Sequence, residues 1–123
     1  MSKYVIKKSQ KDRGLYFILE GDDAAILAES GKYAASMLAR AGMECLRKNA
    51  AEAGIWDRTA DTPACPNPRF EIIPETRGRY TFVFRARNGR EIVRGPIRRN
   101  AEEVKKDISE VKQAAAKARL AMN

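Results

Sequence analysis

The stretch from Gly78 to Val93 constrains the fold most, because it has the alternation and the turn residues of a β-hairpin. Successive side chains of a strand point to opposite faces of a sheet. The apolar face comprises Tyr80, Phe82, Phe84 and Ala86, and the opposite face comprises Arg79, Thr81, Val83, Arg85 and Arg87. The pattern predicts a sheet with its aromatic face in the core and a mostly cationic face outside.

The Asn-Gly pair in the turn of this hairpin permits two registers. A two-residue loop would pair Phe84 with Val93 and would place Ile92 beside Arg85 on the cationic face. A three-residue loop, with its glycine left-handed, would pair Phe84 with Ile92 and Arg85 with Glu91. We favour the three-residue loop, because it joins apolar residues inside and opposite charges outside, and a slip by one residue would reverse both pairings.

The length and composition indicate one compact domain, or two small repeats that share a core. The chain has 123 residues, of which 44% are hydrophobic and 33% are charged. It contains no run of about 18 apolar residues that would span a bilayer, and its first residues lack the apolar segment of a signal peptide. We therefore expect a cytoplasmic protein with no membrane partner.

The side chains that usually perform catalysis or bind metals are scarce. The chain has no histidine, which removes the commonest general base and the commonest metal ligand. Cys45 and Cys65 are too few and too unpatterned for a disulfide framework or a zinc site, so we expect a buried free cysteine and a loop cysteine. Asp22 and Asp23 fit a solvated turn better than a calcium loop. We expect no enzyme, no cofactor and no metal site.

The first half reads as three strands, a helix and a short tail. Strand patterns cover residues 4–8, 15–19 and 24–28. Ser36 stands where a helix cap would, and the apolar face of the helix after it comprises Ala39, Met43, Leu46 and Ala50. The helix should stop near Gly54, and Ile55-Trp56 would follow as a short extended tail. Residues 1–57 therefore form a β-β-β-α unit with a tail strand.

The second half repeats this order after a proline-rich linker at residues 58–68. Strand patterns recur at residues 70–73, 78–84 and 91–93. Asn100 is a plausible cap for a helix whose apolar face comprises Ala101, Val104, Ile108 and Val111. The alanine-rich sequence up to Met122 favours helix, so this unit, residues 69–123, should end in an extended helix without a tail strand.

Two motifs give the chain a resemblance to a known family. The hairpin Gly78–Ile92 and the helix segment Gly42–Ala50, with sequence GMECLRKNA, look like the two signatures of the YegP-like family. These are small bacterial proteins of unassigned function. The resemblance implies an α+β fold in which tandem β-β-β-α repeats form one antiparallel sheet flanked by two helices. It also implies that the short strand after each helix is exchanged between units; Ile55-Trp56 fits that strand, and the second half offers no counterpart.

The positive charge lies in the second half. Residues 1–57 contain 9 Lys or Arg and 8 Asp or Glu, whereas residues 58–123 contain 15 and 8, which together give the net charge of +8. Most of the excess is arginine, whose planar fork suits phosphate and carboxylate groups. The candidate binding residues are Arg77, Arg79, Arg85, Arg87, Arg90, Arg94, Arg98 and Arg99.

Two functions from different classes fit this pattern. The first is a non-enzymatic module that binds an anionic partner, either nucleic acid or an acidic protein surface, through the arginine face. The second is a module for protein interaction or self-assembly, including a homodimer, that acts through the sheet edges and the region of Trp56, with the arginines serving only to keep the sheet soluble. The aromatic residues of the hairpin have the wrong parity to stack on bases among these arginines.

Overall fold

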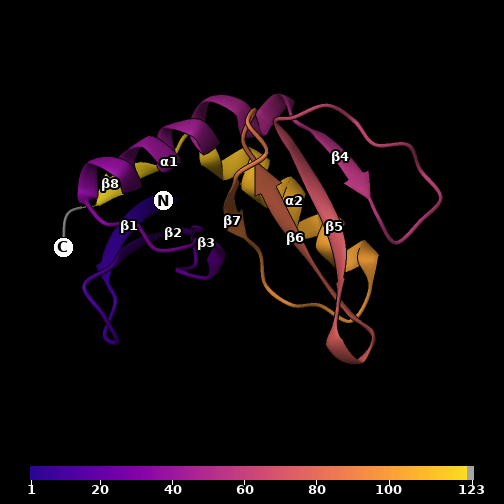
Figure 1. The fold of residues 1–123 in the computed structure, drawn as a ribbon, viewed down its shortest axis with the longest axis horizontal. Coiled ribbons are helices and arrows are strands. Elements are labelled where there is room, and N and C mark those ends of the chain that lie inside the picture. The colour runs from indigo at the N-terminus through magenta and orange to yellow at the C-terminus, as the bar shows by residue number, and fades with distance from the viewer. Residues whose placement is uncertain (122–123) are drawn as a thin grey trace.

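The computed structural model describes residues 1–121 and shows an α+β fold (Figure 1). Two helices, α1 (Ser36–Asn49) and α2 (Ala101–Ala115), accompany one sheet, and short 3-10 turns lie at Ala50–Glu52 and Thr76–Gly78. The strands are β1 (Lys3–Lys8), β2 (Leu15–Glu20), β3 (Ile26–Ser30), β4 (Gly54–Asp57), β5 (Arg69–Glu75), β6 (Arg79–Arg85), β7 (Glu91–Arg94) and β8 (Arg119–Ala121). Residues 58–68 join β4 to β5 without a helix or a strand.

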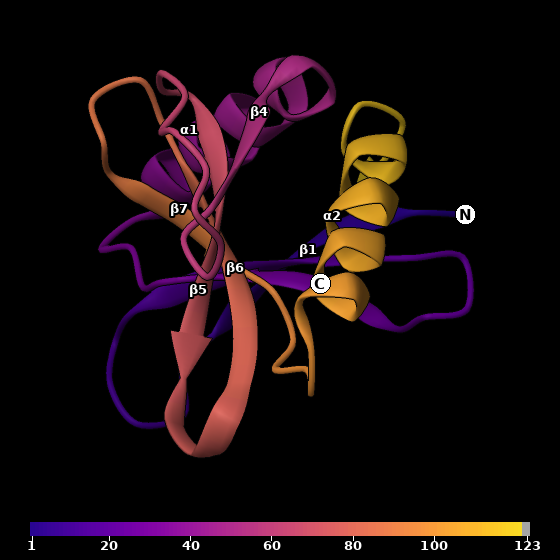
Figure 2. The ribbon, with the colours of Figure 1, turned by 90° about the vertical axis from the view of Figure 1, so that its right-hand side faces the viewer.

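The eight strands form one mixed sheet in the order β4-β5-β6-β7-β3-β2-β1-β8. The predicted sheet was antiparallel throughout, and this is wrong at both ends. There β4 runs parallel to β5 and β8 runs parallel to β1. Each end strand follows a helix and joins the first strand of the other half, so it lies parallel to that strand. Figure 2 shows β1 running across the direction of β5 and β6, which makes the sheet strongly twisted.

The C-terminal segment contradicts the predicted extended helix. Helix α2 ends at Ala115, and residues 119–121 form β8 beside β1. The Tyr4 hydroxyl donates to the Ala115 carbonyl at 2.6 Å, and Leu120 packs against the core. These tertiary contacts outweigh the helix propensity of the alanines. The last residue of the predicted helix, Met122, and residue 123 after it lie outside the described residues.

The third strand and the first helix cap also differ from prediction. Strand β3 starts at Ile26, two residues later than expected, because Ala24 is left-handed and the Asp23 carboxylate accepts from the Ala25 amide, which extends the turn. The cap position of α1 falls on Ala35, which provides no side-chain hydrogen bond, while Ser36 is already inside the helix. The predicted cap of α2 is confirmed, since Asn100 accepts from the Glu103 amide.

The hairpin between β6 and β7 combines features of both registers. The predicted three-residue loop is confirmed: the Ala86 amide donates to the Arg90 carbonyl, and Gly89 has a φ of 87°. Arg85 pairs with Glu91 as expected, but Phe84 pairs with Val93 rather than with Ile92. The register shifts at this point, so Ile92 is the extra residue of a bulge. The bulge lets both Ile92 and Val93 enter the core.

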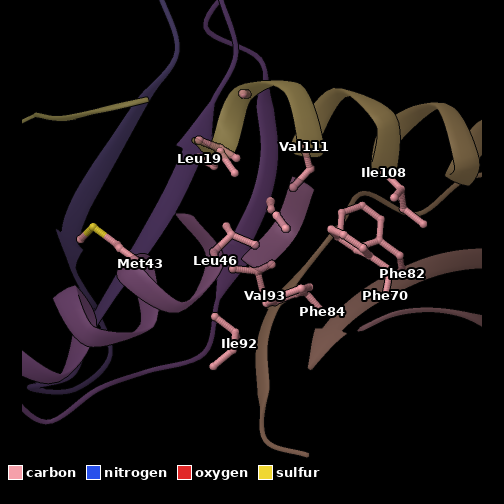
Figure 3. Packing of buried hydrophobic residues seen from close by; sticks show 14 of the residues in the cluster. Leu19, Met43, Leu46, Phe70, Phe82, Phe84, Ile92, Val93, Ile108 and Val111 are labelled. Atoms are coloured by element: carbon pink, nitrogen blue, oxygen red, sulfur yellow. The ribbon is translucent and has the colours of Figure 1, made fainter. Parts of the chain in front are cut away.

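Both helices pack on one face of the sheet and share a single core (Figure 3). The predicted inward faces of both helices are buried, apart from Ala101, which is half-buried. Phe82 and Phe84 are buried and Tyr80 is half-buried, as the hairpin alternation predicted. The opposite face is less exposed than expected, because Thr81 and Val83 are also buried there. Neither helix in residues 1–121 has the length and apolar character needed to cross a bilayer.

Candidate anion-binding face

The strand register gathers four functional side chains on the face of the sheet away from the helices. Phe70 and Ile72 of β5 lie in the core, so the residues that alternate with them, Arg69 and Glu71, point the other way. Cross-strand partners share a face, and the register places three further residues there. Trp56 of β4 is the partner of Glu71, Arg85 of β6 is the partner of Arg69, and Val83 of β6 is the second partner of Glu71.

Glu71 is the centre of this group, and its side chain is only 2% exposed. One oxygen, Oε2, accepts from Arg69 Nε and from Arg85 Nε, both at 2.9 Å. The other oxygen, Oε1, lies 3.6 Å from Arg58 Nη1. Burial disfavours the charged carboxylate, but the hydrogen bonds and positive charges of Arg69 and Arg85 outweigh it and hold the pKa of Glu71 below its usual value.

Trp56 lies among the same arginines. The guanidinium carbons of Arg69 and Arg58 are 4.7 Å and 5.0 Å from the centroid of the indole ring, which is the geometry of a cation–π contact. The indole Nε1 donates to the Thr62 carbonyl at 3.3 Å, so the loop after β4 fixes one edge of the ring. We call Trp56, Arg58, Arg69, Glu71 and Arg85 the Trp–Arg cluster. It carries three positive charges and one negative charge.

The eight predicted arginines do not form one surface. Arg85 belongs to the Trp–Arg cluster, and Arg94 lies on the same face, where it pairs with Glu91 at 2.7 Å and with Glu75 at 3.5 Å. Arg79 alternates with the core residue Tyr80 and is exposed on that face. Within residues 1–121, no carboxylate pairs with Arg79.

The remaining five arginines lie in turns or beside α2. Arg77 is left-handed in the turn before β6, and Arg87 and Arg90 lie in the hairpin loop after it. Arg98 forms a bidentate pair with Asp107 of α2, and Arg99 lies 3.9 Å from Glu103. The Arg98 pair links the segment before α2 to that helix. The strand face predicted from parity is therefore shorter than expected, because Arg77 and Arg87 lie beyond the ends of β6.

Sequence reasoning missed three members of the cluster as binding residues, Arg58, Arg69 and Glu71. The sequence pointed to Trp56 only as a contact for another protein. The alternation within β5 indicates from the sequence that Arg69 and Glu71 lie on the same face of the sheet. The parallel pairing that brings Trp56 beside Glu71 is not readable from the sequence, because it joins segments separated by the linker. The arginine face of the hairpin has no aromatic side chain of its own, and β4 supplies Trp56 to that face.

Comparison with known proteins confirms the predicted resemblance. No family model matches the chain. In sequence, the chain is 27% identical over 119 residues to a UPF0339 protein of Pseudomonas aeruginosa, which covers 97% of this chain and 94% of that protein. The chain is thus similar to the YegP-like, or UPF0339, group of uncharacterised proteins over nearly its whole length.

Two solution structures show the same fold. The YegP protein of E. coli matches with a TM-score of 0.80 at 18% identity, covering 99% of this chain and 92% of that one. A UPF0339 protein of Shewanella oneidensis matches with a TM-score of 0.79 at 15% identity, covering 98% and 90%. The E. coli protein is one of unknown function, and at identities of 18% and 15% these likenesses extend to fold alone.

Proposed function

We propose that the chain is a non-enzymatic module that binds single-stranded nucleic acid through the Trp–Arg cluster. The observation that carries this proposal is the position of Trp56 beside two guanidinium groups, on the face of the sheet that the helices leave open. Proteins that hold single strands combine cationic side chains, which follow the phosphates, with aromatic rings, on which bases stack. A duplex would keep its bases away from the indole, which favours a single strand.

The charges around the cluster support an anionic ligand. Arg58 and Arg94 have side chains that are 47% and 48% exposed, and Arg79 is exposed without an acidic partner in the described chain. The second half as a whole contains 15 basic and 8 acidic residues. Binding should therefore weaken as salt concentration rises, because each neutralised phosphate releases counterions.

The proposal is tested with a fluorescently labelled oligothymidylate, whose anisotropy reports binding at low and high salt. Trp56→Ala should weaken binding about tenfold, since stacking on one aromatic ring contributes about 1–3 kcal/mol per base. Lys48→Ala is the matched control, because it removes an exposed positive charge from α1, on the other side of the sheet. Binding that is insensitive to salt, or equal losses in the two variants, would contradict the proposal.

The second candidate function is protein interaction or self-assembly through the sheet edges. In its favour, β4 and β8 each pair on one side only within the described sheet, and Ile55 on β4 is 41% exposed. An open strand edge can accept a further strand from another chain. Light scattering on the wild type and on Trp56→Ala measures this directly: a dimer that dissociates in the variant would favour assembly over nucleic-acid binding.

We also infer that the halves are tandem copies of one unit, bounded at residues 1–57 and 69–123 and joined by the linker at 58–68. The element order β-β-β-α-β occurs twice, and the sheet order reads the same from either end when the strands of the two halves are exchanged. A single unit of this size would bury too little surface for comfortable stability. Exchange of β4 and β8 between the halves lets each complete the sheet of the other.

A further inference from the structure

One oxygen of the buried Glu71 carboxylate has no hydrogen bond within residues 1–121. Oε1 is fully enclosed, whereas Oε2 accepts from two arginines. Buried carboxylate oxygens almost always accept hydrogen bonds, so an exception calls for a physical reason. The group that lies near Oε1 is the guanidinium of Arg58, whose Nη1 is 3.6 Å away, beyond hydrogen-bonding distance.

Arg58 is held less firmly than the other two arginines of the cluster. Arg69 also donates from Nη1 to the Cys65 carbonyl at 2.6 Å, and Arg85 donates from Nη1 to the Gly89 carbonyl at 3.1 Å. No side-chain hydrogen bond links Arg58 to the described chain, and its side chain is 47% exposed. Its guanidinium lies over the indole of Trp56 as well as near Oε1. Displacement of this one side chain therefore uncovers an aromatic surface and an unused acceptor together.

We propose that Trp56 and Glu71 form a binding site for a single nucleobase, that Arg58 covers the site when it is empty, and that the site prefers guanine. This inference rests on the proposed function and names the base that the cluster selects. The base takes the place of the Arg58 guanidinium on the indole, and an N–H group of the base donates to Glu71 Oε1. The displaced Arg58 is then free to pair with a phosphate of the bound strand.

The preference for guanine follows from the donors on its Watson–Crick edge. Single-stranded bases are recognised by stacking and by hydrogen bonds to this edge. Guanine presents two adjacent donors there, the ring imino group and the exocyclic amino group, and a carboxylate only accepts. Uracil presents one imino group between two carbonyl oxygens, which a carboxylate repels. Adenine and cytosine each present an amino group beside a ring acceptor.

The experiment compares guanosine, inosine and uridine 5′-monophosphates, which carry the same phosphate charge and differ in the base edge. The chain has one tryptophan, so quenching of its fluorescence reports ligands that stack on Trp56. For the wild type at high salt, we expect guanosine monophosphate to bind about tenfold more tightly than uridine monophosphate. Inosine monophosphate, which lacks the exocyclic amino group, should lie between them. Equal affinities would overturn the inference.

Arg58→Ala separates a base site from simple charge attraction. If Arg58 covers the site, its removal tightens guanosine monophosphate binding several-fold, despite the loss of a positive charge. Arg79→Ala is the matched control: it removes an exposed arginine from the same face with no contact to Glu71, and should weaken both nucleotides equally and slightly. Weaker binding of guanosine monophosphate to Arg58→Ala would overturn the inference.

Glu71→Gln should abolish the preference for guanosine over uridine monophosphate, provided that circular dichroism shows a folded variant; Arg58→Ala keeps the test decisive if it does not fold. Binding of oligothymidylate by the wild type distinguishes the two levels of the argument. If the strand binds in a salt-dependent manner and the nucleotides bind equally, the base site is wrong and the proposed function stands. If neither oligothymidylate nor a guanine-rich oligonucleotide binds, both are wrong.

Discussion

Val5 and Glu71 occupy equivalent positions in the two halves of the sheet, and both are buried. Val5 of β1 pairs with Ala121 of the end strand β8, whereas Glu71 of β5 pairs with Trp56 of the end strand β4. In the first half, an apolar pair therefore occupies the position that Glu71 and Trp56 occupy in the second half. A buried carboxylate with its arginines is seldom more stabilising than apolar residues of similar volume. The fold therefore does not require a buried charge at this position.

The glycines that directly follow β7 and β3, Gly95 and Gly31, differ in how closely other side chains approach them. A Cβ added at Gly95 would lie 2.0 Å from the ring of Phe82, whereas a Cβ at Gly31 would have no neighbour within 4 Å. Gly95→Ala should lower the free energy of unfolding by about 3 kcal/mol, because the buried ring must move. Gly31→Ala should change it by less than about 0.5 kcal/mol. Urea denaturation measures both, and similar losses would show that the Phe82 ring accommodates a Cβ at Gly95.

A smaller effect concerns the first strand of each half. The Tyr4 hydroxyl donates to the Ala115 carbonyl, while its counterpart Phe70 has no hydroxyl. Tyr4→Phe should destabilise the protein by about 1–2 kcal/mol, since it leaves a buried carbonyl without its donor. Thermal unfolding measures the loss. Tyr16→Phe is the control, because Tyr16 is only half-buried on β2, and an equal loss there would show that the bond to α2 is unimportant.

Helix α2 has a side-chain cap at its N-terminus and α1 has none, and one substitution at each cap position would reverse this difference. Ala35 and Asn100 have similar extended backbones, with φ of −148° and −150°, but only Asn100 caps its helix with a side chain. Asn100→Ala should reduce the free energy of unfolding by about 1 kcal/mol. Ala35→Asn should increase it by up to about 1 kcal/mol, because it gives α1 the cap that it lacks. Chemical denaturation of each variant checks the two signs, and a loss of stability in Ala35→Asn would show that a side-chain cap does not stabilise α1.

The free energy of unfolding should also depend slightly on the ionisation of Glu71. The pKa of Glu71 is held below its usual value of 4.5, so its ionised form stabilises the folded state. This contribution is fully present above about pH 5 and is lost as pH falls through the pKa of the folded state. Urea denaturation at pH 6 and pH 3 should therefore show a smaller drop for Glu71→Gln than for the wild type. The same drop in both proteins would mean that other carboxyl groups account for the acid sensitivity.

Local sequence patterns predicted most of the helices and strands, because the formation of these elements depends mainly on residues close together in the sequence. Alternation identified β6, and the three-residue loop followed from the expected pairing of opposite charges, which Arg85 and Glu91 make. The inward faces of both helices followed from their periodicity. The bulge at Ile92 could not be predicted, because alternation assumes a regular strand. In the structure the bulge places both Ile92 and Val93 in the core.

Long-range pairing accounts for the errors. The alanines at the end of α2 favour helix locally, yet β8 forms because Leu120 gains a place against the core. The parallel pairing of β4 with β5 set the composition of the candidate site, since it brought Trp56 to Glu71. The sequence therefore indicated a cationic second half. It pointed to the hairpin between β6 and β7 as the candidate site, whereas the Trp–Arg cluster also draws residues from β4 and β5.

The reciprocal positions of β4 and β8 affect how the protein can form during synthesis. The sheet of the first half has no partner at its outer strand until residues 119–121 have left the ribosome, because β8 is the neighbour of β1. The growing chain must hold β1 with one side open while the whole second half is made.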